Sequence, residues 1–448
     1  MLYHLTISKA GTAFRLKRFL LSLFLALLPT GVFGGQNKPQ IQLGARLFAD
    51  ERFSNPNGDF SASCSHCHIL NENAQGMRVY TDFLARSWVP WRLEDPKRDA
   101  LRNAPTILDA GEMPLLHFDG EFPSLEDLVR GTLTGRSLGW LPGEEPKARE
   151  RIHRILSGES SYRDQFKEAY GQSIEALDPG RTLDLVARAL SDYMRSLKTQ
   201  RTAPYDRFIE RNGLASAPEQ GEPAPALARR LILQVRELEK EKRLSLPGGF
   251  GPDALKGMKM FFTAGASGPA GNCAACHVPP LFTDFSFHNT GISQVEYDKV
   301  HGEGSFARLG IPDAASAVRP SVQFRETPSP GRPGSVDLGF WNFAKLSGSP
   351  LRRAGETDDA FLRRMTAAFK TPTLRNLAFS EPYMHNGAYP TLESVISELM
   401  RLSGMARAGR IRESDPELTR IRIRTADVAP LIAFLNSLNE DWNSAYHR

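Results

Sequence analysis

The sequence predicts a mainly α protein of two domains, with long loops and few strands. Apolar residues recur at helical spacing in several segments, whereas the alternating pattern of a half-buried strand is rare. One short cysteine motif occurs twice, in parts of the chain that lie far apart. The length of 448 residues is enough for two or three domains, each with its own core.

The first 34 residues predict a signal peptide rather than a part of the fold. Basic residues precede an apolar run from Phe19 to Leu28, and Gly34 offers a small residue for cleavage. The run is too short to span a bilayer, and no later apolar stretch approaches that length. We therefore expect export to the periplasm and no membrane span in the mature chain.

The charge balance argues against a nucleic-acid partner. Removing the four basic residues of the signal segment from the formal net charge of +5 leaves about +1. A surface that binds nucleic acid needs clustered basic charge, and no such cluster occurs in the mature sequence.

Helical spacing and composition predict the order of elements along the mature chain. Residues 213–225 are rich in Ala, Pro, Gly and Glu, as a linker is, and 325–350 predict a long loop. The domains then follow as 35–212, a linker with an amphipathic helical insertion over 213–250, and 251–448. Helices are predicted over 41–50, 183–197, 226–244 and 425–438.

All four cysteines fall in two C-x-x-C-H motifs, so none is left for another disulfide. This motif is the attachment signature of c-type haem. Two thiols three residues apart on one turn can each form a thioether, and the adjacent histidine presents its imidazole to the iron. The attachment residues are Cys64 and Cys67 with His68, and Cys273 and Cys276 with His277. We therefore expect two covalently bound haem c groups.

Three other interpretations of the cysteines remain open. A zinc ribbon needs its two C-x-x-C pairs roughly 15–20 residues apart, whereas these pairs lie about ten times farther apart. A disulfide within each pair suits an oxidising compartment but does not explain the histidine after both pairs. A redox C-x-x-C of the thioredoxin type has no need of that histidine either.

The sequence resembles the bacterial dihaem cytochrome c peroxidases and their relatives, the MauG-type enzymes. The resemblance extends from about Leu43 to Leu438, and its segments occur in the family's order. They are LGARLFADERFS, CSHCH, RNAPTIL, FDGEFPSLEDL, APYDRF, CAACH, LFTDFSFHNTG, TPTLRNLAFSEPYMHNG and LIAFLNSL.

The resemblance implies two cytochrome-c-like haem domains packed face to face, with a calcium ion between the haems. It implies that hydrogen peroxide reacts at the N-terminal haem, with His68 as its proximal ligand, while electrons enter through the C-terminal haem. Asn103, through its side chain, and Ser380 and Pro382, through their carbonyls, match the calcium positions. The family is commonly dimeric, which makes a homodimer an expectation here.

The chain departs from the peroxidase pattern near the first haem. No histidine lies between His68 and His117, so the capping ligand of the resting peroxidases is missing and an open iron site is expected. Phe118 stands where the family places a tryptophan before an Asp-Gly pair. Leu138 aligns with the family's catalytic glutamate, and Arg136 is the expected substitute, stabilising developing negative charge.

The sixth ligand of the second haem is a separate expectation. Without gaps, the position of the family's methionine or tyrosine ligand falls on Leu399, which cannot bind iron. A shift of one residue places Met400 there, and Met400 is the expected ligand. The alternative is that no strong ligand occupies this position. A further expectation is that His288 and His385 anchor the second domain through hydrogen bonds rather than bind iron.

Three functions follow from these expectations. The first is a periplasmic dihaem peroxidase that takes electrons from a small donor protein. The second is a MauG-like oxidase that uses peroxide to modify a partner protein. The third is a dihaem electron-transfer cytochrome without catalysis.

Overall fold

The computed structural model describes residues 38–58, 61–72, 78–81, 102–265, 268–311, 336, 339–340 and 351–441, with only the backbone described for 69–72 and 78–81. The predicted signal peptide and most of the predicted loop 325–350 lie outside these residues. The chain divides into two units, Met1–Lys38 and Pro39–Arg448, and both haem motifs belong to the second.

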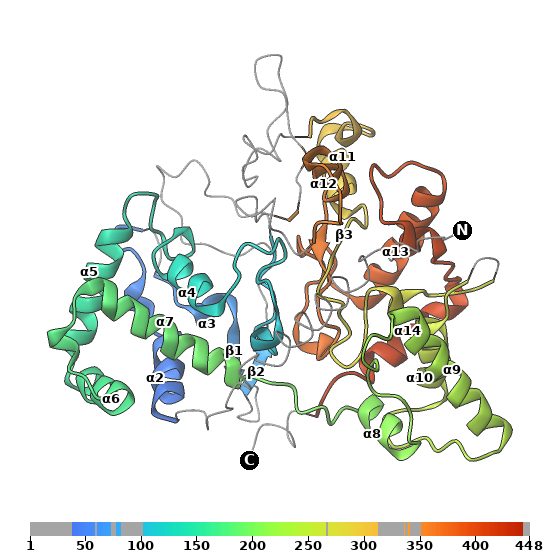
Figure 1. Cartoon of the computed structure of the whole chain (residues 1–448), viewed down its shortest axis with the longest axis horizontal. Coiled ribbons are helices and arrows are strands. Elements are labelled where there is room, and N and C mark those ends of the chain that lie inside the picture. Colours follow the sequence, from blue (N-terminus) through green and yellow to red (C-terminus); the bar gives the residue numbers. More distant parts are fainter. Residues whose placement is uncertain are drawn as a thin grey trace, which may run out of the picture. The chain divides into compact units, whose positions relative to one another are not determined.

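In the part of the chain that carries the first motif, the described residues form α-helices, one hairpin and the loops between them (Figure 1). Strands β1 (Ile69–Glu72) and β2 (Arg78–Thr81) form this antiparallel hairpin, with Ile69 opposite Thr81. The helices are α2 (Lys38–Phe48), α3 (Cys64–Cys67), α4 (Leu125–Leu133), α5 (Glu145–Gly158), α6 (Ser160–Tyr170) and α7 (Pro179–Ser196).

The part that carries the second motif follows the same plan. Strands β3 (Phe287–His288) and β4 (Phe369–Lys370) pair antiparallel. The helices are α8 (Pro204–Arg211), α9 (Ala224–Lys240), α10 (Pro252–Phe262), α11 (Ile292–His301), α12 (Asp358–Arg364), α13 (Leu392–Arg407) and α14 (Thr425–Asn436). The mainly α prediction is confirmed.

The predicted helices are found, with their ends shifted by a few residues. Helix α7 begins at Pro179 instead of residue 183, because the Asp178 side chain accepts from the amide of Arg181 and Pro179 suits the first turn. Periodicity misses such a polar first turn. Helix α13 begins in the same way, since the Thr391 side chain accepts from the amide of Ser394.

Each haem motif has its own hydrophobic core. The first core draws its buried side chains from Leu43 to Leu197. The second draws them from Tyr205 to Leu438 and includes side chains of α8, α9, α10 and α14. The change between them falls close to the predicted end of the first domain, although the domain boundaries themselves stay a prediction.

The two cores are closed by the same kind of helix crossing. A Cβ atom at Gly44 of α2 would lie 2.1 Å from the carbonyl oxygen of Ala189 in α7. A Cβ atom at Gly257 of α10 would lie 1.9 Å from the carbonyl oxygen of Pro430 in α14. Only glycine allows backbones to approach so closely. In each half the helix before the haem motif therefore packs directly on the last helix.

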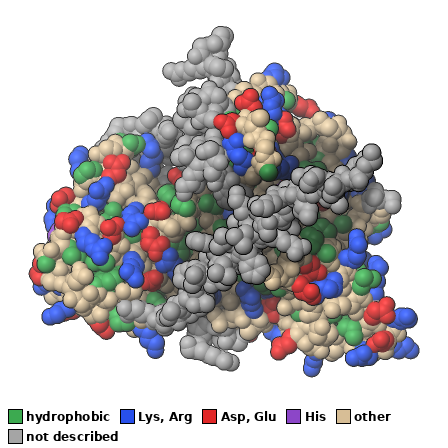
Figure 2. Space-filling view, in the orientation of Figure 1, with side chains coloured by type: hydrophobic (Ala, Val, Ile, Leu, Met, Phe, Trp, Pro, Cys, Tyr) green, Lys and Arg blue, Asp and Glu red, His purple; other side chains and the backbone are tan. Residues whose placement is uncertain are grey.

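The described surface carries both signs of charge. On the face shown in Figure 2, basic and acidic side chains are interspersed over the coloured surface and do not gather by sign. Among the described residues, no helix is both long and apolar enough to cross a membrane.

Candidate functional site

The two C-x-x-C-H motifs differ in helix type but share one backbone hydrogen bond. The first forms the short helix α3, and the second forms a 3-10 turn over Cys273–Ala275. In both, the amide of the histidine donates to the carbonyl of the first cysteine, at 2.9 Å for His68 and 2.9 Å for His277. This bond places the histidine one turn after the first cysteine, so the thiols and the imidazole belong to one compact loop.

A phenylalanine supports the motif histidine in each half. The ring centroid of Phe48 lies 6.4 Å from that of His68, with an interplanar angle of 44°. The ring centroid of Phe261 lies 6.5 Å from that of His277, with an angle of 47°. Each phenylalanine comes four residues after the glycine of the helix crossing. The helix crossing therefore also positions the attachment loop.

The imidazole of His277 is oriented as a metal ligand. Its Nδ1 lies 2.9 Å from the carbonyl oxygen of Phe282, so Nδ1 carries the hydrogen and donates it. Burial is the largest influence on its pKa and lowers it, which keeps the ring neutral. The Nε2 lone pair is then available for iron, as a proximal haem ligand requires.

The cysteines are free thiols in the structure, without disulfides. Burial raises the pKa of Cys64 and Cys273 to about 12, so both sulfurs are neutral at physiological pH. The disulfide interpretation therefore gains no support from the geometry of these loops.

A large cavity lies beside the second motif. It encloses about 1670 Å³ of empty space, part of it open to solvent. Cys273, Cys276 and His277 line it, and helix α13 lines it with an apolar stripe. The stripe consists of Leu392, Val395, Ile396 and Leu399. The residues therefore fit a haem attached through the two thiols.

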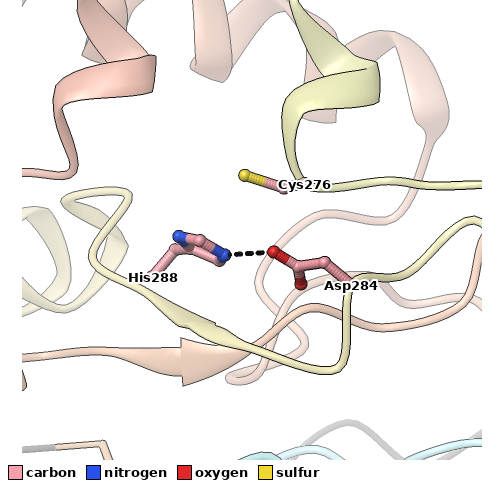
Figure 3. A group of neighbouring side chains, drawn as sticks. All are labelled: Cys276, Asp284 and His288. Carbon is pink, nitrogen blue, oxygen red and sulfur yellow. Dashed lines mark hydrogen bonds and ion pairs between the residues drawn. The ribbon is translucent and has the colours of Figure 1, made fainter. Parts of the chain in front are cut away.

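A partly buried ionic cluster closes one side of this cavity. His288 Nε2 lies 2.8 Å from Asp284 Oδ2, as Figure 3 shows. His288 Nδ1 lies 2.6 Å from Asp415 Oδ2. Burial alone would lower the pKa of His288, but its hydrogen bonds to the two carboxylates raise it to about 12. His288 is therefore an imidazolium held between two carboxylates.

The hydrogen bonds of this cluster argue against a metal site at these residues and against ligation of haem iron by His288. Cys276, Asp284 and His288 have the side-chain types of a metal site and lie close together (Figure 3). Both nitrogens of His288 are committed to carboxylates, so the ring has no lone pair left for a metal. The expectation that His288 anchors the domain and does not bind iron is confirmed.

His385 is held in a similar way. Its Nε2 lies 3.2 Å from Ser293 Oγ, and its ring stacks on Phe369 with centroids 3.5 Å apart and an angle of 8°. The Arg102 guanidinium lies 4.8 Å from the Phe369 centroid on the same ring and pairs with the buried Asp119. These contacts support the expectation that His385 anchors the second domain.

Sequence reasoning missed the carboxylates that hold His288. Asp284 precedes His288 by four residues, a spacing that could have been noticed in LFTDFSFHNTG. Asp415 is 127 residues away from His288 in the chain, and no local pattern connects them. Only the folded chain brings this third member to the cluster.

The three predicted calcium positions line one cavity. Asn103, Ser380 and Pro382 all lie on the wall of the cavity that holds the second motif. Asn103 Nδ2 lies 2.6 Å from the carbonyl oxygen of Pro382, and Asn103 Oδ1 is buried without a hydrogen-bond partner. Turning the amide over would direct Oδ1 toward this carbonyl, as a shared cation needs. The donor set therefore fits calcium.

The remaining predicted residues are placed as follows. Arg136 is half-buried and begins a 3-10 turn that continues to the core residue Leu138. Met400 is half-buried against the second core, whereas its neighbour Leu399 lines the cavity. Phe118 lines the same cavity.

Comparison with known proteins agrees with the two haem attachment motifs. The family described as di-haem cytochrome c peroxidase matches residues 38–213. The cytochrome-c peroxidase IdrP2 of Pseudomonas sp. (strain SCT) is 25% identical over 424 residues, covering 93% of this chain and 85% of that protein. The methylamine utilization protein MauG of Methylorubrum extorquens is 25% identical over 402 residues, covering 90% of this chain and 78% of its own length.

A solved structure supports the fold. The diheme peroxidase BthA from Burkholderia thailandensis E264 superposes with a TM-score of 0.53 at 20% identity, covering 90% of this chain and 86% of that one. The likeness in structure spans both motif-bearing parts of the chain.

Proposed function

Because the chain is similar over most of its length to dihaem cytochrome c peroxidases and to MauG proteins, we propose that it reduces hydrogen peroxide to water at its N-terminal haem. Electrons from a small donor protein would enter through the C-terminal haem. The predicted signal segment supports a periplasmic location for this reaction. The enzyme would be an oxidoreductase with two haem c groups, as the matching family is.

The observation that carries this proposal is the duplicated attachment geometry. Both motifs place a histidine one turn after the first cysteine, against a phenylalanine of the crossing helix. Two haems held in this way, one of them open, are what distinguish an enzyme from a carrier with closed sites. The missing histidine between His68 and His117 supports an open site at the first haem.

The bound haems would supply the redox chemistry, in which one peroxide takes up two electrons and two protons to give two waters. The chain supplies the ligands and the surroundings. His68 would hold the first iron and raise its electron density. Arg136 would stabilise the negative charge that develops on the leaving oxygen.

Turnover of hydrogen peroxide with a reduced small c-type cytochrome tests the activity. We expect saturable oxidation of the cytochrome that depends on peroxide. Absence of turnover, together with binding of cyanide to the ferric protein, would instead favour the MauG-like oxidase. Absence of both would leave the electron-transfer cytochrome.

Arg136→Ala tests the assigned role of that residue. We expect kcat/KM for peroxide to fall about 100-fold, the size of effect seen when one preorganised donor is removed. Arg149→Ala, an exposed change on helix α5, is the matched control and should leave the rate unchanged. An unchanged rate in Arg136→Ala, with both haems retained, contradicts the assignment.

We also propose one calcium ion at Asn103, Ser380 and Pro382. The buried and unpaired Oδ1 of Asn103 supports it, because such an atom is costly unless a partner is present. Metal analysis of the purified protein should find about one calcium per chain, reduced in Asn103→Ala and unchanged in the exposed control Asn57→Ala. Equal calcium in both variants would exclude Asn103 as a ligand.

A MauG-like oxidase is the second candidate function, favoured by the same missing histidine. It differs in its substrate, which would be a partner protein. Phe118 argues against it, because a phenyl ring is harder to oxidise than the indole that the family places there. Homodimer formation is a further proposal and is tested by sedimentation.

A further inference from the structure

Helix α13 contributes an apolar wall to the cavity beside the second haem motif. Its cavity-lining side chains follow the spacing i, i+3, i+4, i+7, so one face of the helix points at the cavity. Leu399 is the last of these side chains, and none of the four has an atom that binds iron. Met400 is one residue further, a rotation of about 100° around the helix, and packs against the second core.

Helix α13 and the attachment loop form different parts of the cavity wall. The loop Cys273–Ala275 packs on α9 and α10, whereas α13 packs on α14 and on the 3-10 turn Pro416–Arg420. Both walls line the same cavity, so a haem attached to the loop and held by His277 would share this cavity with the apolar stripe.

The cavity also contains side chains that could bind iron, but their polar atoms are engaged elsewhere. His288 gives both nitrogens to carboxylates, and His385 bonds Ser293 and stacks on Phe369. The Tyr383 hydroxyl donates to the carbonyl of Leu377 at 2.9 Å, so its proton is already engaged in a hydrogen bond.

Lysine and methionine complete the candidates on the cavity wall. Lys370 Nζ donates to the carbonyl of Leu115 at 2.7 Å. Met384 is half-buried and packs against a separate cluster that includes Ile292 and Leu402. The side chains on the described cavity wall are therefore committed to other contacts, while the stripe of α13 remains directed at the cavity.

We propose that none of the described side chains on the cavity wall binds the iron of the C-terminal haem opposite His277, so that this haem is a second open site, which binds small neutral diatomic molecules such as carbon monoxide or nitric oxide. The apolar stripe offers no hydrogen-bond donor to an anion, and a buried anion without a partner is unfavourable. A neutral diatomic ligand needs no such donor. This inference rests on the attachment of haem at Cys273 and Cys276 but not on peroxidase activity.

Counting bound carbon monoxide per chain in the fully reduced holoprotein tests the proposal. The parent protein should bind two molecules, one at each haem. Leu399→Met puts a thioether where the stripe faces the cavity and should reduce the count to one. The same variant should gain a sulfur-to-iron charge-transfer band in the near infrared and a higher C-terminal haem potential.

Two matched variants control for the other methionines. Met400→Leu and Met384→Leu should leave the carbon monoxide count and the spectrum of the parent unchanged. A sulfur-to-iron band in the parent that either variant removes would overturn the proposal, because that methionine would then be the ligand.

The counts also separate this proposal from the peroxidase proposal. One molecule in the parent and none in Leu399→Met would support the open C-terminal haem and show that the N-terminal haem is closed. One molecule in both proteins would show the reverse and overturn the proposal. Two molecules in both would overturn the placement of Leu399 opposite His277.

Discussion

The two haem-binding parts of the chain share a scaffold but differ in the histidine beside the attachment loop. In the first part His66 bonds Ser63 through Nδ1, and its Nε2 lies 3.5 Å from the exposed carboxylate of Glu51. In the second part His288 is locked between two largely buried carboxylates. The scaffold around the iron ligand is thus duplicated, whereas the electrostatics beside it are not.

This difference in electrostatics indicates which interactions hold the structure around each histidine. A buried ion pair tolerates little change, because losing one partner leaves an uncompensated buried charge. A half-exposed contact such as His66–Glu51 is screened by solvent and contributes little. One wall of the cavity beside the second motif is therefore held by ion pairs. The loop of the first motif is held mainly by its backbone hydrogen bonds.

The largest expected effect comes from breaking the attachment sites separately. Replacing Cys64 and Cys67 by Ser should remove one covalent haem, and replacing Cys273 and Cys276 should remove the other. Intact mass and haem staining after denaturing electrophoresis measure this, with Ser65→Ala as the control that keeps both. A parent protein without covalent haem would contradict the duplicated site altogether.

Replacing His288 and His66 separately by Gln tests whether the ion pairs of His288 stabilise the protein more than the exposed contact of His66. His288→Gln should lower the free energy of unfolding by about 3–5 kcal/mol, because Asp284 and Asp415 would be left without a cation. His66→Gln is the matched control and should cost less than about 1 kcal/mol. Denaturant unfolding at constant ionic strength measures both, and equal losses would refute the difference between the halves.

The pH dependence of the same cluster follows from its shifted pKa values. The raised pKa of His288 means that its contribution to stability is complete below about 6.5 and is lost only as the pH rises toward about 12. The pKa of Asp284 is lowered, because its bonds to His288 outweigh burial, so its contribution is present above its unfolded value and is lost at acid pH. We expect the difference in unfolding free energy between parent and His288→Gln to be largest and constant between about pH 5 and 6.5. Above this range it should fall by about 1.4 kcal/mol per pH unit, because only the folded state then keeps the proton on His288. A difference that stays constant between about pH 6.5 and 9 would contradict a raised pKa of His288.

The smallest expected effect on stability comes from the glycine helix crossings, which both halves share. Gly44→Ala and Gly257→Ala should each cost about 1–3 kcal/mol, because the added methyl meets a carbonyl oxygen of the crossing helix. Gly158→Ala, where nothing lies within 4 Å of the added atom, is the control and should be neutral or slightly stabilising. A large loss in only one half would show that the two crossings are not equivalent.

The sequence alone determined the features that depend on local spacing. C-x-x-C-H is a pattern within one turn, so the sequence assigns both predicted attachment sites to individual residues. Helices such as α7 and α9 were predicted because an amphipathic period repeats along a short segment. Their first turns were missed where a capping side chain, and not an apolar residue, sets the start.

Only the tertiary structure decided which side chains face the second haem. Leu399 and Met400 are neighbours in the chain, and their difference is a rotation about a helix whose orientation depends on packing against α14. Asp415 reaches His288 across 127 residues, and Asn103 reaches Pro382 across 279. Contacts at such separations depend on how whole elements pack, and no local pattern of residues encodes that packing.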